Sequence, residues 1–260
     1  MKQKHEEIAE AIQKMAVKLL ATSPTGEGMC LIGGFRYRFL DQSCRVSLDL
    51  DYHWPGDLEK KQSQVLSLFS KKLLPLVKER LGFDGNVSAA TGPDAESSFV
   101  KTVDVAVWSA DSVPGRITIP VDITRIMCID KPVVRTVDGV VYLSASDTDM
   151  VESKVVAVFA RLKVEERDIV DVFLFKDKIA ADSAERLRRK FAELPLADSA
   201  IEATIKSING NRSLHVRNID GIVADQIDSS AAANIRKAGG GDMIFRQVMD
   251  LLKNLLRLAM

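Results

Sequence analysis

Hydrophobic and polar positions follow a helical period over long stretches of this 260-residue chain. In residues 3–21, apolar side chains recur every three or four positions, which predicts a helix with one buried face. Residues 58–80 repeat that pattern, although Pro75 inside them favours a kink. The helical period dominates again over residues 151–260, so we expect a helical C-terminal part.

Between these stretches the period changes to two, which is typical of strands. Residues 45–54, RVSLDLDYHW, alternate strictly. We expect the apolar positions from Val46 to Leu50, including Leu48, on the face of this strand that packs on the core. Two further alternating runs, residues 99–108 and 116–124, favour an antiparallel hairpin.

A shorter pair of apolar runs flanks Asp138-Gly139, a two-residue sequence that favours a tight hairpin turn. Together, the patterns predict an α+β fold with a mixed β-sheet flanked by helices. We expect this domain to occupy residues 1–150 and a helical domain, residues 151–260, to follow it.

Composition narrows the class of protein. Lys plus Arg number 36 and Asp plus Glu number 36, so net charge provides no general attraction to nucleic acid or to a membrane. The charged N-terminus does not resemble a signal peptide, and no apolar run approaches the ~18 residues of a membrane span. The 3 cysteines lack the spacing of a metal site, and their odd number favours reduced thiols. We therefore expect a soluble, cytoplasmic protein without a membrane partner.

Two carboxylates in the predicted strand 45–54 are the first candidates for chemistry. Side chains two positions apart on a strand point to the same face, so Ser47, Asp49 and Asp51 should share its polar face. Like charges this close repel each other unless a cation lies between them, and Mg²⁺ carrying the phosphates of a nucleotide would meet that need. The alternative is a solvated outer face on which the two aspartates have no chemical role.

A pair of glycines, Gly33-Gly34, supports the first interpretation. The pair follows an apolar stretch and precedes a short predicted helix. A turn at that point can bring backbone N–H groups and a helix N-terminus close to phosphates. We therefore expect the glycine turn and the aspartate strand to meet at one site.

Metal-dependent phosphoryl chemistry calls for a third carboxylate on a neighbouring strand. Asp122 lies on the polar face of the run 116–124, and Asp104 in the run 99–108 is its competitor. Pro120 cannot donate a ladder hydrogen bond, so its strand should be an edge strand or should be bulged at that point.

These residues resemble a known motif. Gly33-Gly34 followed by RVSLDLDY, residues 45–52, resembles the first motif of the polymerase-β-like nucleotidyltransferases, and most closely that of the AbiEii/AbiGii-type toxin nucleotidyltransferase family. Residues 152–175 are similar to a later motif of that family, in which an E-K-x-x-A-x-x-x-R helix leads into an R-D-x-x-D helix. The matching positions are Glu152, Lys154, Ala157, Arg161, Arg167, Asp168 and Asp171.

The resemblance implies a nucleotidyltransferase that uses Mg²⁺ to move a nucleotidyl group from an NTP to an acceptor hydroxyl. It implies that the metal ligands are Asp49, Asp51 and Asp122, and that Lys154 and Asp168 complete the catalytic group.

Other positions of the two motifs have binding or supporting roles by the same resemblance. The nucleotide would be bound by Gly33, Gly34, Ser47 and Lys154, and the site would be supported by Arg161, Arg167 and Asp171. Two alternatives stay open: Lys154 is a solvated helix residue, or Asp168 joins the salt bridges of Asp171 and leaves the chemistry to the strands.

For the acceptor we favour RNA, such as the 3′ end of tRNA, because RLRRK at residues 186–190 provides local positive charge and the family includes toxins that block translation. A protein side chain or a small molecule is the alternative acceptor. The resemblance also implies the toxin of a toxin–antitoxin or phage-defence system, with an antitoxin as partner. The competing class is a nucleotide-binding regulatory protein without turnover, which Pro120 and the bulky Phe35-Arg36 after the glycines would favour.

Overall fold

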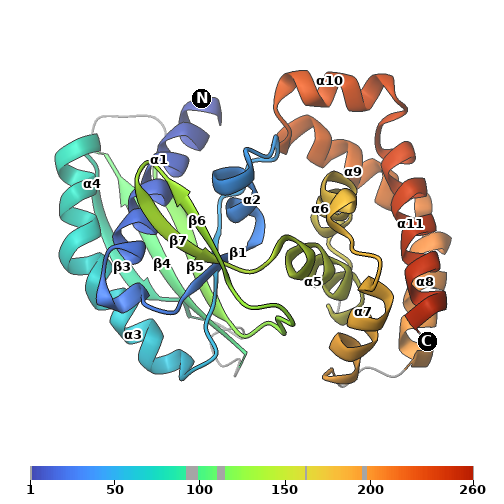
Figure 1. Cartoon of the computed structure of the whole chain (residues 1–260). Helices are drawn as coiled ribbons and strands as arrows, with labels where there is room; N and C mark the ends of the chain where they lie inside the picture. The colour runs from blue at the N-terminus through green and yellow to red at the C-terminus, as the bar shows by residue number, and fades with distance from the viewer. Residues whose placement is uncertain (1, 92–98, 110–114, 162, 195–197, 260) are drawn as a thin grey trace. The chain divides into compact units, whose positions relative to one another are not determined.

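The computed structural model describes residues 2–91, 99–109, 115–161, 163–194 and 198–259, which form two compact units (Figure 1). Unit 1 comprises Met1–Ile126 and Pro132–Ala145, and unit 2 comprises Met127–Lys131 and Ser146–Met260. The expected boundary at residue 150 differs from this division, because unit 2 already begins at Ser146, just before its first helix. In addition, the segment Met127–Lys131, which lies between two strands of unit 1, belongs to unit 2.

Within the described residues, a mixed sheet of 7 strands forms the centre of unit 1, in the order β3-β4-β5-β2-β1-β7-β6. The strands are β1 (Cys30–Ile32), β2 (Leu50–His53), β3 (Asp84–Ala89), β4 (Val100–Trp108), β5 (Ile117–Thr124), β6 (Val133–Val137) and β7 (Val140–Ser144). β2 runs parallel to β5, and β1 runs parallel to β7, whereas the other neighbours are antiparallel.

Helices cover one face of this sheet and bury its apolar side chains. They are α1 (Lys2–Ala21), α3 (Leu58–Leu68) and α4 (Leu74–Leu81), with short turns η1 (Pro24–Gly26) and η2 (Phe69–Leu73) between them. α1 contacts β5 and β7, and α3 contacts β4 and β5. A further helix, α2 (Gly33–Asp41), contacts β1 and β2. The amphipathic patterns in residues 3–21 and 58–80 are confirmed as helices of this layer.

The interruption expected at Pro75 is a single π-helical turn, η2. Pro75 has no N–H group and cannot donate to the carbonyl of Lys71, as the α-helical ladder would require. The wider turn just before Pro75 accommodates the missing hydrogen bond, so the chain continues from α3 into α4.

The β6–β7 hairpin is present, and the antiparallel pairing expected for the other two runs is confirmed. β6 and β7 are joined by Asp138 and Gly139, whose φ angles of 49° and 74° give the left-handed turn that matches the twist of two antiparallel strands. β4 and β5 pair antiparallel over their length. Their connection, residues 110–114, lies outside the described residues.

The strand expected over residues 45–54 is shorter than predicted, because only its second half, β2, joins the sheet. Ser47 is buried and Leu48 is 45% exposed, so the apolar face assigned to this segment is wrong there. Gln13 of α1 donates from Nε2 to the carbonyl oxygens of Ser47 and Asp49, at 3.0 and 3.3 Å. These backbone acceptors are therefore satisfied by a helix side chain and need no neighbouring strand.

β5 is an inner strand and keeps a one-to-one register with β4 through Pro120, so the prediction of an edge strand or of a bulge at Pro120 is wrong. Pro120 pairs with Asp104 on the β4 side. On the other side, pairing with β2 begins one residue later, where Leu50 meets Val121. Pro120 thus lies where β5 has no β2 neighbour, and its missing donor interrupts no ladder on that side.

Unit 2 is helical, as expected for the C-terminal part. Its helices are α5 (Asp147–Ala160), α6 (Glu166–Phe175), α7 (Ser183–Ala192), α8 (Asp198–Gly210), α9 (Arg212–Gln226), α10 (Ser229–Lys237) and α11 (Gly240–Ala259), with a short turn η4 (Lys176–Lys178). α11 contacts α6, α7, α9 and α10, and it therefore packs against most of the other helices described in this unit. None of the described helices combines the length and the apolar character needed to cross a bilayer.

Candidate active site on the sheet of unit 1

Asp51 of β2 and Asp122 of β5 lie opposite each other on neighbouring parallel strands. Adjacent strands are ~4.8 Å apart, and register partners point to the same face of a sheet. The residues next to them in sequence, Leu50, Tyr52 and Val121, are buried in the core on the other face. The two carboxylates are therefore neighbours on the polar face.

Gly33 is in direct contact with Asp51. Ile32, the last residue of β1, pairs with Asp51, and Gly33 follows it as the first residue of α2 with a φ of +75°. A Cβ added to Gly33 would lie 1.8 Å from Oδ2 and 2.5 Å from Cγ of Asp51. Only glycine combines this φ with this close approach, so the structure brings the glycine turn and the aspartate strand together.

Gly34 makes a similar approach to the segment before β2. A Cβ added there would lie 2.4 Å from Nη2 of Arg45 and 2.5 Å from Oγ of Ser47. Arg45 and Ser47 are 5% and 6% exposed. Our sequence reasoning gave Arg45 no role, and its place in the R-x-S-x-D motif was the available signal. It adds a cation beside the glycine turn.

The start of α2 is suited to an anion. Ile32 is at the N-cap position, and its side chain cannot accept a hydrogen bond from the first N–H groups of the helix. Such groups carry partial positive charge and attract phosphates or carboxylates. The first turn of α2 is the part of this helix that lies against Asp51.

Asp49 precedes β2 and accepts a hydrogen bond from Oγ of Ser47. In the described part of the chain, no group of three or more His, Cys, Asp and Glu side chains is arranged to hold a metal ion. Mg²⁺, however, usually keeps several waters and binds through one or two carboxylates plus the phosphates of a substrate. The register pair of Asp51 and Asp122 fits that requirement.

Thr102 of β4 extends the site on the far side of β5. Its Oγ1 donates to Oδ1 of Asp122 at 2.5 Å, and the two residues are register partners. Asp104 pairs instead with Pro120, farther along the same face. The register therefore places Asp122, and not its competitor Asp104, beside Asp51. We missed Thr102 because a threonine on the polar face of a strand has no distinctive pattern.

Lys154 and Asp168, which we also expected at the active site, belong to unit 2. Nζ of Lys154 lies 3.0 Å from Oδ1 of Asp168 and 3.2 Å from Oδ2 of Asp171. Nε of Arg161 lies 3.0 Å from Oδ2 of Asp168, and both aspartates are buried. Arg167 is half-buried on the same helix, α6. These contacts form a salt-bridge cluster that ties α5 to α6, and the roles of Lys154 and Asp168 toward a nucleotide stay predictions.

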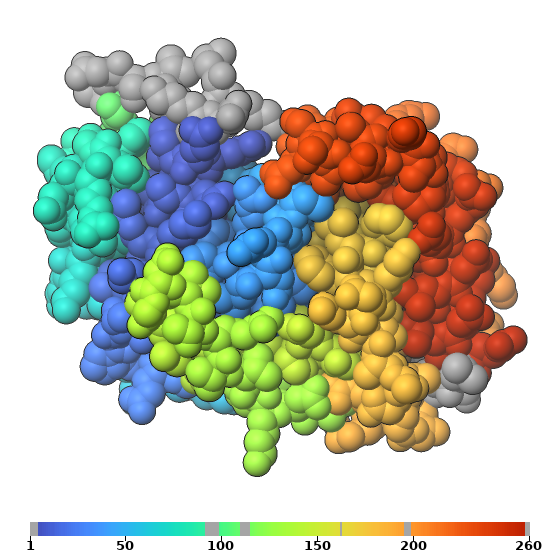
Figure 2. Space-filling model, turned by 45° about the horizontal axis from the view of Figure 1, so that its top comes forward, coloured from blue at the N-terminus to red at the C-terminus, as the bar shows by residue number. Residues whose placement is uncertain are grey.

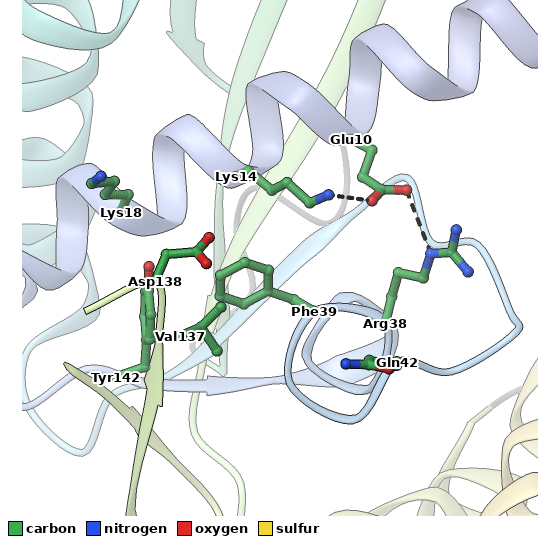
Figure 3. A pocket seen from close by; sticks show the side chains of 9 residues that line it. All are labelled: Glu10, Lys14, Lys18, Arg38, Phe39, Gln42, Val137, Asp138 and Tyr142. Carbon is green, nitrogen blue, oxygen red and sulfur yellow. Dashed lines mark hydrogen bonds and ion pairs between the residues drawn. The ribbon is translucent and has the colours of Figure 1, made fainter. Parts of the chain in front are cut away.

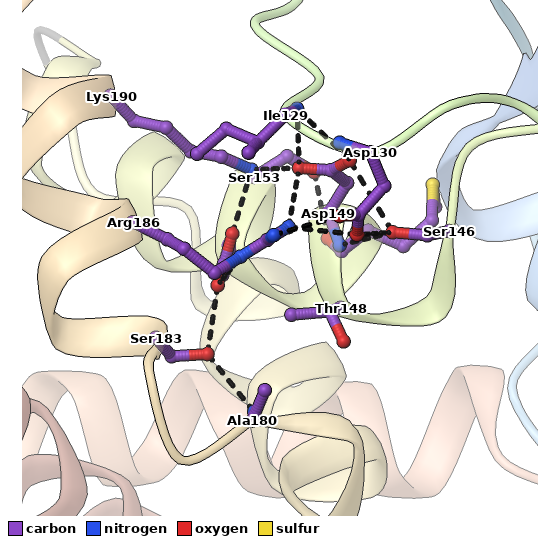
Figure 4. A network of polar contacts seen from close by, with 12 residues as sticks. Ile129, Asp130, Ser146, Thr148, Asp149, Ser153, Ala180, Ser183, Arg186 and Lys190 are labelled. Carbon is purple, nitrogen blue, oxygen red and sulfur yellow. Dashed lines mark hydrogen bonds and ion pairs between the residues drawn. The ribbon is translucent and has the colours of Figure 1, made fainter.

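The local positive charge expected from RLRRK is smaller than the sequence suggests, because two of its basic side chains are buried in ion pairs. Nη1 and Nη2 of Arg186 each lie 2.9 Å from an oxygen of Asp130 (Figure 4). Nε of Arg186 lies 2.8 Å from Oε1 of Glu152. Nζ of Lys190 lies 2.7 Å from Asp149 and 2.9 Å from Glu152. Arg186 and Lys190 are only 7% and 3% exposed, because they neutralise carboxylates inside unit 2.

No protein-family model matches the chain, and no curated protein matches it in sequence. Its structure does resemble solved structures. JHP933 from Helicobacter pylori superposes with a TM-score of 0.54 at 17% identity, over 96% of this chain and 94% of that one. MenT4, a nucleotidyltransferase toxin from Mycobacterium tuberculosis, superposes with a TM-score of 0.55 at 14% identity, over 98% of this chain and 87% of its own. The chain therefore shares its fold with a nucleotidyltransferase toxin, which confirms the fold that the sequence resemblance implies.

Proposed function

We propose that the chain is a nucleotidyltransferase, which moves a nucleoside monophosphate from an NTP to an acceptor hydroxyl. The observation that carries this proposal is the pairing of Asp51 with Asp122, with Gly33 held against the Asp51 carboxylate. A glycine turn at a helix N-terminus suits a triphosphate, because backbone N–H groups and the helix dipole attract anions. The fold shared with MenT4 supports the same activity.

In the proposed reaction, the acceptor oxygen forms a bond to the α-phosphorus of the NTP. The bond from this phosphorus to the bridging oxygen breaks, and pyrophosphate leaves. Asp122 accepts the proton of the hydroxyl, and Thr102 orients the Asp122 carboxylate through its hydrogen bond. The N–H groups at Gly33 and Gly34 bind phosphate oxygens, and the hydroxyl of Ser47 orients the Asp49 carboxylate through its hydrogen bond.

Asp51 and Asp122 would hold Mg²⁺, with Asp49 as a further ligand. When bound, the ion neutralises charge on the triphosphate and lowers the pKa of the attacking hydroxyl. The support for this assignment is the donor set, since two neighbouring carboxylates repel each other unless a cation lies between them.

The acceptor that we favour is the 3′ end of tRNA, and the biological role is that of a toxin in a toxin–antitoxin or phage-defence system of the cytoplasm. The motif resemblance to the AbiEii/AbiGii-type family supports this role, as does the fold of MenT4, a nucleotidyltransferase toxin. A toxin requires an antitoxin, so a partner protein that suppresses the activity is part of the proposal.

Labelled nucleotides test the reaction directly. Purified protein is incubated with each α-labelled NTP, Mg²⁺ and total RNA, and the label is followed on RNA and on protein. We expect label on RNA and loss of labelling in Asp49→Ala, Asp51→Asn and Asp122→Asn at unchanged thermal unfolding. Asp104→Asn is the matched control, because it lies on the same sheet face beside Pro120 and should retain labelling.

The outcomes separate the alternatives. Label on protein alone would identify a protein acceptor and reject RNA. Full activity in Asp51→Asn or Asp122→Asn would eliminate the proposed site. Binding of NTP without transfer to any acceptor would favour a nucleotide-binding regulatory protein.

A further inference from the structure

A hollow in unit 1 lies between α1, the C-terminal end of α2 and the β6–β7 hairpin (Figure 3). Figure 2 shows these segments of unit 1 on one face of the molecule. Its volume of about 450 Å³ is in the range of small-molecule sites, roughly 300–1,000 Å³. The glycine turn is at the other end of α2. This hollow is therefore distinct from the carboxylate pair.

The centre of the hollow is an aromatic ring. Phe39 is half-buried, and its ring lies among the other lining side chains in Figure 3. It stacks on Phe35 with centroids 5.7 Å apart, and it meets Tyr142 edge-on at 5.1 Å. Two aromatic contacts thus hold Phe39 in place while part of its ring faces the hollow. A ring held in this way is a platform on which a planar ligand can stack.

Positive charge lines one wall. Lys14 and Lys18 are four residues apart on α1 and so lie on the same side of the helix. Glu10 neutralises part of this wall, because its carboxylate lies 2.7 Å from Nζ of Lys14 and 3.4 Å from Nε of Arg38. Burial raises the pKa of Glu10, but Lys14 and Arg38 outweigh burial and hold this pKa below its ordinary value.

Lys18 provides the surplus charge. Within the described part of the chain it has no carboxylate partner. Like charges at positions i and i+4 destabilise a helix unless an anion lies between them. A dianionic group between Lys14 and Lys18 would remove this repulsion.

The opposite wall offers a hydrogen-bond acceptor. Asp138 lines the hollow from the turn of the β6–β7 hairpin, near Phe39 (Figure 3). Its backbone is fixed in the left-handed conformation by the two-residue turn with Gly139. A carboxylate can accept hydrogen bonds from an amino group on a ring that stacks on Phe39.

We propose that this hollow binds a nucleoside monophosphate. The base stacks on Phe39, an exocyclic amino group of the base donates to Asp138, and the phosphate lies between Lys14 and Lys18. Each part of such a ligand meets a matching group, whereas inorganic phosphate lacks the ring and a nucleoside lacks the anion. The site does not depend on the transferase activity proposed above.

Titration calorimetry of the full chain in EDTA tests the proposal, because EDTA excludes Mg²⁺-dependent binding at the carboxylate pair. AMP and CMP should bind. Adenosine and inorganic phosphate should bind at least about tenfold more weakly, which corresponds to about 1.4 kcal/mol. UMP, whose base lacks an exocyclic amino group, should also bind more weakly than AMP. Equal affinity for AMP and inorganic phosphate, or no binding of AMP, would overturn the proposal.

Variants locate the binding site. Lys18→Ala should weaken AMP binding about tenfold, and Lys72→Ala, an exposed lysine elsewhere on unit 1, should not change it. Asp138→Gly keeps the turn, because glycine tolerates the left-handed conformation, and it removes the acceptor, so it should abolish the preference for AMP over UMP. AMP binding that is lost in Asp51→Asn but unchanged in Lys18→Ala would assign the nucleotide to the carboxylate pair and refute the second site.

Discussion

Replacing Gly33 with alanine tests the contact between the glycine turn and Asp51. Gly33 has a φ of +75°, a conformation that costs an L-residue about 1–2 kcal/mol. The new Cβ would also lie 1.8 Å from Oδ2 and 2.7 Å from Cβ of Asp51, closer than such atoms can approach. Asp51 must move, and forced repacking of this kind costs about 1–3 kcal/mol. We therefore expect Gly33→Ala to lower the free energy of unfolding by about 2–5 kcal/mol.

Gly82 provides a matched control. Its φ is +74°, and among the described atoms nothing lies within 4 Å of an added Cβ. Gly82→Ala thus carries the conformational cost alone. Because both variants exchange glycine for alanine, their effect on the unfolded chain is the same and cancels in the comparison. The difference between the two losses, about 1–3 kcal/mol, measures the clash with Asp51.

Urea unfolding followed by far-ultraviolet circular dichroism measures both losses, provided that the m-values agree. Nucleotidyl transfer should be lost in Gly33→Ala, at a temperature where the variant is folded, and retained in Gly82→Ala. Equal losses of stability in the two variants would refute the reasoning, since they would show that Gly33 is not in contact with Asp51 in solution.

Two further predictions concern unit 2. Arg186→Met should lower the free energy of unfolding by about 3–5 kcal/mol, because it leaves buried carboxylates without their main partner. Arg188→Met on the same helix breaks only an exposed ion pair and should change the free energy of unfolding far less. Similar losses of stability in Arg186→Met and Arg188→Met, measured by urea unfolding, would contradict the prediction that Arg186 neutralises buried carboxylates. Burial raises the pKa of Glu166, but hydrogen bonds from Asn218 and His215 outweigh burial and hold this pKa below the ordinary 4.5. The unfolded chain therefore binds this proton more readily than the folded chain does, and acid favours unfolding. The stability difference between the wild type and Glu166→Gln should therefore shrink as the pH falls from about 6 to about 3, and a constant difference would disprove the assignment.

The face of Asp122 could be predicted from the sequence because side chains of a strand alternate with a fixed period. Alternation in the run 116–124 assigned the apolar residues to the core and Asp122 to the other face, and the structure agrees. The choice between Asp122 and Asp104 could not be made in this way. It depends on the register between β5 and β2, which pairs residues far apart in the sequence.

The segment before β2 shows where pattern reasoning fails. Strict alternation from Arg45 predicts a strand, but Gln13 donates to the carbonyl groups at the start of this segment and Ser47 bonds to Asp49. Local partners of this kind compete with a strand ladder, and no periodicity reveals them. The prediction of surface charge from the basic run of α7 is wrong for a related reason. Arg186 is buried because carboxylates from other segments surround it.

The candidate site and the hydrophobic core depend on the same strand register. Ile32, Asp51, Asp122 and Thr102 are successive register partners on β1, β2, β5 and β4, so they form one row across four strands. A slip of one residue in any of these pairs would turn the alternating side chains to the opposite face. Such a slip would expose buried residues such as Leu50 and would place a carboxylate in the core. The free energy of burying the apolar face therefore holds the two carboxylates side by side.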